Sequence, residues 1–450
     1  MSPALLCCLL AAGISAAGAA SGPAANSGAS SPDWLIRAST YRSKYYNITT
    51  DFTPEDAKRM AEHVDSTFES YLRLFSKLPV RVQRPAALDL YLFVTEDDYH
   101  KVLKARFGDE GLGSWGTCIS SGNRIWLVGW RGEYTLEQMK PLLQHEGFHQ
   151  LARHLFGDLP VWANEGLAEL FERGIMIDGQ LVLGEVTPAT RQRLLEAIAQ
   201  QKTLPLDQFF KVDHQQWLRS VHTSDAGALY LQAWSLVHFL IFADQGKYEA
   251  GFLKFLVQLN RGMDWRQAFV ASFGMPDFKA LETKWLDYAR TTPPADYRET
   301  VRRLKFLSAG LAELHKQGRR PTSLDELREQ LQEINFECQP DLFGQARKLS
   351  AADRRMFEVP FAEGVEARKF TLVESRSGPS AKPPPYNIAV GGLEPQAFAA
   401  QWTRRGRETS YAITVSPAGQ QKTKPGSAAA KTAAGSSAKP SVSSARERGR

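Results

Sequence analysis

Cysteine is scarce in this chain, and two of the four cysteines lie near its start. Of the four cysteines among 450 residues, Cys7 and Cys8 fall within an apolar N-terminal segment. Cys118 and Cys338 are therefore the two that remain in the body of the chain, so at most one intramolecular disulfide can form there. Because the sequence does not show whether they are close in space, they are either a pair or two free thiols.

A basic surplus is also missing from most of the chain, although the whole sequence has a net charge of +6. The last 40 residues contain seven Lys or Arg and a single acid, so residues 1–410 have no net charge. A folded nucleic-acid-binding domain with a basic face is therefore not expected. The surplus lies in residues 416–450, which are rich in Ala, Ser, Lys and Pro and are predicted to be disordered. This basic tail could contact anionic envelope polymers or act as a solvated solubility tag.

Apolar runs long enough to span a membrane are absent from the rest of the chain. Residues 4–20 are too short and too rich in Gly and Ala for a span, and Ala17-Gly18-Ala19 suits signal-peptidase cleavage. No Lys or Arg precedes them, unlike a typical signal. We predict an export signal over residues 1–20, the alternatives being a disordered Ala-rich start or a misplaced start codon. The mature chain is then expected to be periplasmic or secreted, without a transmembrane segment.

The remaining composition is globular, with 43 % hydrophobic and 10 % aromatic residues. No internal repeat is found, and apolar spacing indicates both strands and helices. Up to residue 130 we expect strands at 45–50, 87–94 and within 111–130, and helices at 54–77 and 96–106. Beyond it we expect helices at 135–156, 160–173, 187–201, 225–243, 247–260, 264–273, 276–290, 298–316 and 322–334. A mixed sheet followed by a helical region predicts an α+β fold.

Changes in composition divide the chain further. Residues 336–415 contain short β-prone runs broken by Gly and Pro, which predicts a small separate module. The predicted organisation is a signal peptide at 1–20, a linker at 21–33, a main domain at 34–292, a helical extension at 293–335, the β-containing module at 336–415 and the tail at 416–450.

The most specific motif is His145-Glu146-Gly147-Phe148-His149, within a predicted helix. Residues i and i+4 lie on one helical face, about 5–6 Å apart at Cβ, so both imidazoles can reach one small cation. Glu146 then lies beside the open coordination position, as in HExxH metallopeptidases. A chance match in such a chain is roughly one in a hundred. The alternative is a pair of surface histidines.

The segment that follows offers a third ligand. Residues 159–174, LPVWANEGLAELFERG, predict a second helix that folds back over the first. Catalytic zinc takes three protein ligands and a water, and two His with one Glu is an established set. Glu165 is the expected carboxylate, with Glu169 as its substitute. Otherwise Glu169 is placed to accept a hydrogen bond from the far nitrogen of a ligand imidazole. Glu172 is expected on a solvated helix face, where Glu165 and Glu169 would also lie if no metal binds.

HEGFH followed by WANEGLAE resembles the gluzincin zinc peptidases: thermolysin-like enzymes, large zinc aminopeptidases and smaller exported "peptidase MA-like" bacterial proteins of unknown function. The resemblance covers roughly residues 40–290. It implies a thermolysin-like catalytic domain, with a mixed sheet and an active-site helix followed by a helical subdomain. It also implies Zn²⁺ bound by His145, His149 and Glu165, and Glu146 as the general base. A metzincin site is excluded because Ala152 and Leu155 occupy the positions that require Gly and His.

The resemblance also suggests an oxyanion donor downstream. Residues 225–243 place Tyr230, Trp234 and His238 on one helical stripe. In the zinc aminopeptidases a tyrosine hydroxyl at a comparable distance fills this role, so Tyr230 is the first candidate. His238 and His222 are weaker candidates, and the alternative is that these are core residues.

A G-x-M-E-N stretch, which anchors the substrate's free amino terminus in the aminopeptidases, is missing. The corresponding residues 111–117 contain no carboxylate, although an expected edge strand at 123–129 could pair with an extended peptide. We therefore expect an exported zinc endopeptidase acting on peptides or proteins. The rivals are a non-catalytic zinc-bearing envelope binding or scaffold protein, and a structural module whose working parts are 336–415 and the tail.

Overall fold

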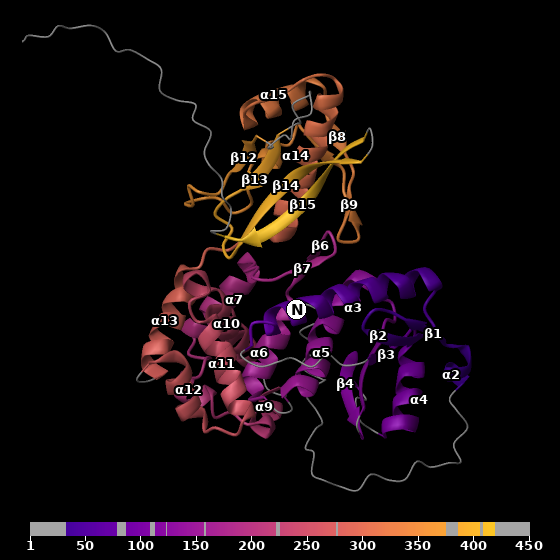
Figure 1. Cartoon of the computed structure of the whole chain (residues 1–450), viewed down its shortest axis with the longest axis vertical. Coiled ribbons are helices and arrows are strands. Elements are labelled where there is room, and N and C mark those ends of the chain that lie inside the picture. Colours follow the sequence, from indigo (N-terminus) through magenta and orange to yellow (C-terminus); the bar gives the residue numbers. More distant parts are fainter. Residues whose placement is uncertain are drawn as a thin grey trace, which may run out of the picture.

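The computed structural model describes residues 33–78, 87–108, 113–122, 124–156, 159–221, 226–275, 278–374, 386–405 and 408–418. The predicted signal peptide, nearly all of the linker and most of the basic tail lie outside the described residues. Two parts are visible in Figure 1: a lower one with a sheet and many helices, and an upper one built on a second sheet. Among the described residues, no helix has the length and apolar character needed to cross a membrane.

A five-stranded mixed sheet lies at one side of the lower part, with the order β1-β2-β3-β5-β4. Its strands are β1 (Ser39–Arg42), β2 (Tyr46–Thr50), β3 (Leu88–Phe93), β4 (Gly116–Ser121) and β5 (Arg124–Trp130). β2, β3 and β5 are parallel, whereas β1 and β4 are antiparallel to their neighbours at the two edges. β5 therefore pairs on both sides, and the expectation of an edge strand at 123–129 is wrong. The edge strand is β4, whose Gly, Ser and Thr residues give a weak strand signal.

Both faces of this sheet are covered. Leu90 and Leu92 of β3 belong to the large core with α3 (Pro54–Phe75) and α5 (Leu136–Phe156), while Tyr91 and Phe93 face a smaller core. That smaller core includes residues of α2 (Asp33–Arg37) and α4 (Glu96–Phe107). Thr53 and Thr95 cap the amino ends of α3 and α4 by accepting backbone N–H groups.

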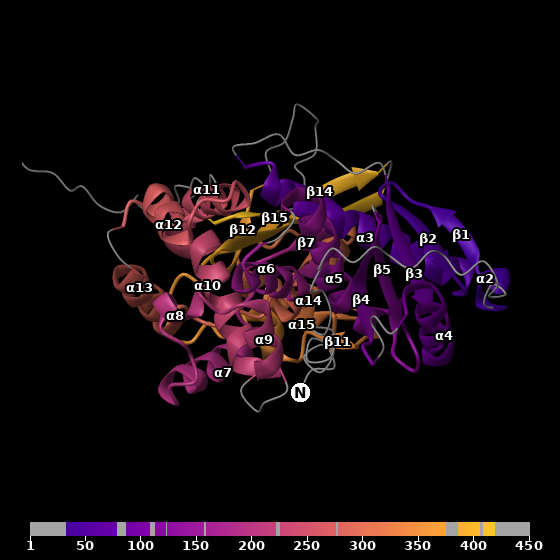
Figure 2. The ribbon, with the colours of Figure 1, turned by 90° about the horizontal axis from the view of Figure 1, so that it is seen from below.

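The helical region lies on the other side of α5, as the view from below shows (Figure 2). Its helices are α6 (Val161–Glu172), α7 (Pro188–Ala199), α8 (Leu206–Phe209), α9 (His214–Val221), α10 (Ala226–Gly246), α11 (Glu249–Asn260), α12 (Trp265–Phe273) and α13 (Phe278–Thr291). α10 is the central one, apolar on most sides, and packs against α6. Its backbone leaves helical geometry at Ala243–Gln245, so the regular helix ends close to the expected residue 243.

The upper part consists of α14 (Tyr297–Lys316), α15 (Leu324–Glu333), the 3-10 turn η1 (Arg354–Phe357) and an antiparallel sheet. The strands of that sheet, in order, are β12 (Phe370–Val373), β13 (Asn387–Val390), β14 (Gln396–Arg405) and β15 (Glu408–Pro417). Two short pairs join them: β8 (Glu337–Cys338) with β11 (Leu349–Ser350), and β9 (Asp341–Leu342) with β10 (Gln345–Ala346).

A hairpin from the lower part completes the upper core. β6 (Ile175–Ile177) and β7 (Gln180–Val182) follow α6 directly and join at Asp178-Gly179, both with positive φ, as in a type I′ turn. Ile175, Ile177 and Val182 pack in one core with α14 and the upper sheet. At the tip, Asp178 accepts from Lys305 Nζ (2.6 Å) and from a backbone N–H of β15 (2.9 Å).

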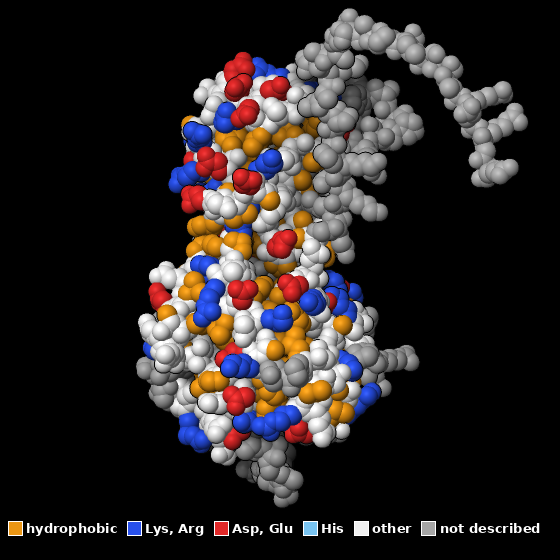
Figure 3. Space-filling model, turned by 90° about the vertical axis from the view of Figure 1, so that its left-hand side faces the viewer, with side chains coloured by type: hydrophobic (Ala, Val, Ile, Leu, Met, Phe, Trp, Pro, Cys, Tyr) orange, Lys and Arg blue, Asp and Glu red, His pale blue; other side chains and the backbone are white. Residues whose placement is uncertain are grey.

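The predicted α+β fold is confirmed: a mixed N-terminal sheet is followed by a helical region and a C-terminal antiparallel sheet. The division into segments stays a prediction. Cys118 is buried and Cys338 half-buried, and the two are not joined by a disulfide. On the face drawn in Figure 3, basic and acidic side chains are interspersed, in keeping with the balanced charge of residues 1–410.

Candidate metal centre

α5 is fixed against the sheet and α3 by small and polar residues on one side. A Cβ at Gly147 would lie 3.2 Å from Tyr71 Oη and 3.6 Å from Leu127 Cδ2, so glycine allows close packing here. Gln150 Nε2 donates to backbone carbonyls of β3 (3.0 Å) and β5 (2.8 Å). Tyr71 Oη donates to Gln144 O (2.5 Å). The opposite side of α5, with both motif histidines, is thereby turned toward α6.

α6 is held across α5 at one end and against α10 along its length. Gln144 Nε2 donates to the carbonyls of Phe171 (2.6 Å), Glu172 (3.1 Å) and Gly174 (3.1 Å). A Cβ at Gly166 would lie 2.6 Å from Ala233 O of α10. These contacts set the rotation of α6 that points Glu165 at α5.

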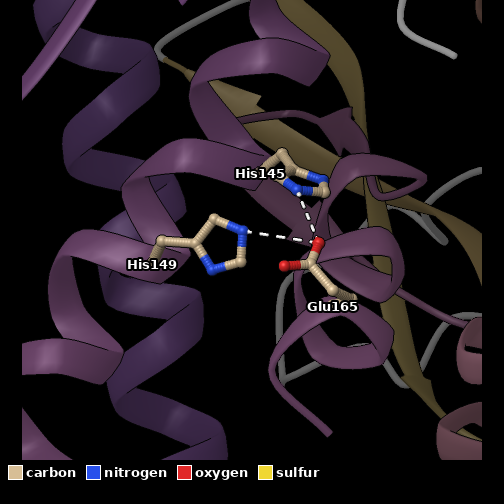
Figure 4. Close-up of side chains that lie close together, drawn as sticks. All are labelled: His145, His149 and Glu165. Atoms are coloured by element: carbon tan, nitrogen blue, oxygen red, sulfur yellow. Dashed lines mark ion pairs between the residues drawn. The ribbon is translucent and has the colours of Figure 1, made fainter. Parts of the chain in front are cut away.

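The structure brings the three predicted ligands together (Figure 4). Glu165 Oε2 lies 3.5 Å from His145 Nε2 and 3.7 Å from His149 Nε2. Two donor atoms bound to tetrahedral zinc at about 2.1 Å lie about 3.4 Å apart. The group therefore needs only small adjustments to hold a metal ion. His149 Nδ1 is buried and has no hydrogen-bond partner among the described residues.

Burial and the two imidazoles have opposite effects on the pKa values of Glu146 and Glu165. Glu146 is 4 % exposed, and burial raises its pKa, although His149 and His145 oppose the rise. Burial would also raise the pKa of Glu165, but the charges and hydrogen bonds of His149 and His145 outweigh it and lower that pKa. Glu165 is thus anionic, as a metal ligand must be. Glu146 has the higher proton affinity expected of a general base.

A different glutamate from the expected one orients His145. The sequence pattern assigns this contact to Glu169, whereas in the structure His145 Nδ1 donates to Glu172 Oε2 (2.9 Å). The Glu169 carboxylate is instead paired with Arg173 Nη2 (2.5 Å), whose guanidinium lies over the Trp234 ring. The side chain of Glu172 is only 10 % exposed, so the expectation of a solvated Glu172 is wrong. Burial raises the pKa of Glu169, and Arg173 opposes the rise.

The candidate oxyanion donors fare differently. Tyr230 is buried, with its ring edge-on to Trp217 at 5.0 Å, and lies one turn before Ala233, which contacts α6. Both ring nitrogens of His238 are engaged: Nε2 donates to Gly184 O (3.2 Å), and Nδ1 accepts from Tyr288 Oη (2.9 Å). Burial lowers the pKa of His238 to about 4, so it is neutral. Both ring nitrogens of His238 are thus already bonded within the core, and His222 lies outside the described residues.

The comparison with known families falls on this same part of the chain. Residues 141–259 match the family described as "Protein of unknown function (DUF1570)". The DUF1570 segment begins within α5 and continues through α6 and α10 into α11. It contains His145, His149 and Glu165, which we call the metal group. No curated protein matches the chain. The DUF1570 match thus singles out the part that contains the metal group and assigns no activity to it.

His145, His149 and Glu165 could hold one divalent ion and leave a coordination position open. A donor set of two imidazoles and a carboxylate suits zinc. Glu172, which orients His145, and Gln144, which holds α6 against α5, were not predicted from the sequence. For Glu172 the sequence did contain a signal. It lies seven residues, or two helical turns, after Glu165 and therefore on the same side of α6.

Proposed function

We propose that this protein is an exported zinc-dependent peptidase. The observation that supports this most directly is the placement of His145, His149 and Glu165 at separations suited to one tetrahedral ion, with the buried Glu146 next to them in sequence. The resemblance of HEGFH and WANEGLAE to gluzincin peptidases gives these residues the same roles.

The proposed reaction is hydrolysis of a peptide bond. Zinc bound by the three ligands would supply a Lewis acid and lower the pKa of a coordinated water. Glu146 accepts a proton from the attacking water and passes it to the departing amide nitrogen as the C–N bond breaks. Glu172 holds the tautomer of His145 that leaves Nε2 free of a proton, so this nitrogen would be able to bind zinc. Tyr230 stays the first candidate for an oxyanion donor.

An endopeptidase is favoured over an aminopeptidase. Residues 113–117 contain no carboxylate to anchor a free amino terminus. The edge strand β4 lies beside α5, where Gly116 approaches Leu142, and leaves backbone groups for an extended peptide to pair with.

The test combines metal analysis with a peptidase assay on the full chain. We expect about one zinc per chain, chelator-sensitive cleavage of unstructured protein such as casein, and recovery on adding zinc. Glu146→Gln should retain zinc and lose at least about a hundredfold in turnover. Cleavage by the Gln variant at the wild-type rate would reject the role of Glu146. A zinc-loaded wild type that cleaves no peptide library would favour the non-catalytic binding or scaffold protein instead.

Export and envelope contact are the remaining parts of the proposal. Residues 1–20 would direct export to the periplasm or the medium, and the basic tail could contact anionic envelope polymers. Because β15 extends to Pro417, a truncation after residue 418 removes the tail without cutting the sheet. Loss of envelope association with unchanged peptidase activity is expected if the tail has this role. Unchanged association would leave it a solubility segment.

A further inference from the structure

Arg153 lies on the same face of α5 as His145 and His149. It follows His149 by four residues and His145 by eight, so its Cα is about 6 Å further along the same face. Burial raises the pKa of Glu146 most strongly, and the charge of Arg153 is among the influences that lower it. Arg153 is half-buried, whereas the next residue, His154, is exposed.

The guanidinium occupies the middle of the sheet's open edge. Arg153 Nη1 donates to Cys118 O and to Ser120 Oγ, each at 2.9 Å. The bond from Trp130 N to Trp115 O sets the alternation along β4. Residues 115, 117, 119 and 121 direct their backbone groups at β5, so those of residues 116, 118 and 120 point outward.

This contact places the guanidinium beside the outward backbone groups of β4. Because Arg153 already donates to Cys118 O, an added peptide strand would share that acceptor with the guanidinium. A peptide that pairs with β4 from Gly116 to Ser120 would therefore pass next to Arg153.

Arg153 forms no close ion pair within the described part of the chain. No Asp or Glu among those residues lies within 4 Å of its guanidinium, whereas Arg173 of the segment after α6 is paired with Glu169. A guanidinium presents a rigid fork of donors that matches a carboxylate, and Nη1 is the one nitrogen with partners here.

We propose that Arg153 binds a carboxylate of the substrate and makes the peptidase selective for it. The carboxylate is an Asp or Glu side chain, or the terminal carboxylate, within about two residues of the scissile bond, since one helical turn is about 5.4 Å. This inference rests on the proposed peptidase function.

The first experiment compares the cleavage of a peptide library by zinc-loaded wild type, Arg153→Gln, Arg153→Glu and a control, Arg106→Gln. Arg106 lies on α4, where Nη1 donates to Tyr91 Oη, and its loss changes the net charge equally. Wild type and the control should prefer a carboxylate at one fixed position. Arg153→Gln should lose about tenfold or more in kcat/KM for those substrates and about twofold or less for neutral ones. Arg153→Glu should prefer Lys or Arg at that position.

Two arms separate the sources of the carboxylate. Amidating the peptide C-terminus abolishes the preference if the terminal carboxylate is bound, and replacing Asp or Glu by Asn or Gln abolishes it if a side chain is bound. A uniform loss on all substrates in Arg153→Gln, accompanied by a lower melting temperature, would make Arg153 a structural link between α5 and β4 and overturn the proposal.

A binding measurement keeps this inference distinct from the proposed function. The probes are succinic and glutaric monohydroxamates, whose hydroxamate binds a metal and whose other end is a carboxylate. Each is compared with the analogue in which an amide replaces that carboxylate. Binding of these probes requires the metal but no turnover. The acid should bind about tenfold or more tightly than the amide to wild type, and equally to Arg153→Gln. If this holds while no library peptide is cleaved, the peptidase function fails and the carboxylate site stands. Equal binding of acid and amide to wild type overturns the carboxylate site even if peptides are cleaved.

Discussion

His145 links the metal group to the residue that orients it, because each of its two ring nitrogens lies close to a different glutamate. Nε2 lies 3.5 Å from Glu165 Oε2, and Nδ1 donates to Glu172 Oε2 at 2.9 Å. A carboxylate on the far nitrogen fixes the tautomer and increases the basicity of the ligating nitrogen. Glu172 would therefore influence a bound metal through His145, without belonging to the group of His145, His149 and Glu165.

We expect Glu172→Gln to lower zinc affinity by about 10–100-fold while leaving the fold intact, because an amide orients His145 less strongly than a carboxylate. Competition with a chromogenic chelator measures this. Glu169→Gln is the matched control, since Glu169 is on the same helix but is paired with Arg173. Its zinc affinity should stay within about threefold of wild type. The reverse order of the two variants would return the positioning role to Glu169.

The sequence could predict the metal group but not the partner of His145. The i and i+4 spacing within α5 leaves one geometry for the two histidines, so His145 and His149 follow directly from the pattern. Glu165, Glu169 and Glu172 are spaced four and three residues apart and share one side of α6. Which of them meets His145 depends on the rotation of α6 and on the capture of Glu169 by Arg173, both set by tertiary contacts.

At the scale of elements, glycines bring the helices of the site close together. A Cβ at Gly166 would lie 2.6 Å from Ala233 O and 2.7 Å from Val237 Cγ2. The closer atom belongs to the backbone of α10, so it cannot move aside by rotation of a side chain. The glycine that follows Glu165 is therefore needed for α6 to rest on α10.

Gly166→Ala should lower the free energy of unfolding by about 1–3 kcal/mol, because the added methyl group overpacks the contact between α6 and α10. Chemical denaturation measures this, and the shift of α6 should also weaken zinc binding. The sign is diagnostic, since Gly→Ala in a helix without such a contact stabilises it by about 1 kcal/mol. A more stable Ala variant would contradict the close approach.

Long helices were predictable and short strands were not. Apolar periodicity and a Thr-Pro-Glu start located α3, which ends within two residues of the expectation. β4 was missed because its Gly, Thr and Ser residues indicate a turn as readily as a strand. The β6–β7 hairpin was missed although Asp178-Gly179 between two short apolar runs is typical of a type I′ turn. The helical pattern on either side of it masked that signal.

At the scale of the whole molecule, the segment after the hairpin joins the lower part, which contains the candidate metal ligands, to the upper part. Gly184 O accepts from His238 Nε2 (3.2 Å) and from Tyr297 Oη (3.3 Å), so one carbonyl bonds to both α10 and α14. Gln396 of β14 donates through Nε2 to Leu183 O (2.9 Å). These contacts join residues far apart in the chain, and no local sequence pattern predicts them.

Glu185 lies in the same segment, which forms the joint between the lower and upper parts. It makes the stability of this joint depend on pH. Its carboxylate accepts from Tyr297 N (2.6 Å) at the start of α14. Burial raises its pKa to about 7, with Asp296 contributing to the rise and Arg298 opposing it. The folded state therefore favours the protonated form. The stability contributed by Glu185 is complete below its unfolded pKa near 4.5 and is lost as the pH rises through about 7.

We expect wild type to lose about 3 kcal/mol more than Glu185→Gln between pH 4.5 and pH 7.5, because each pKa unit corresponds to about 1.4 kcal/mol. Gln keeps an acceptor for Tyr297 N–H and does not titrate in this range. Urea denaturation across this range, with a chelator present, measures the difference between the two proteins. All other ionisable groups are the same in both proteins, so their contributions cancel in that difference. Parallel pH profiles would mean that Glu185 is already ionised in the folded protein, and that the joint between the two parts is open to water.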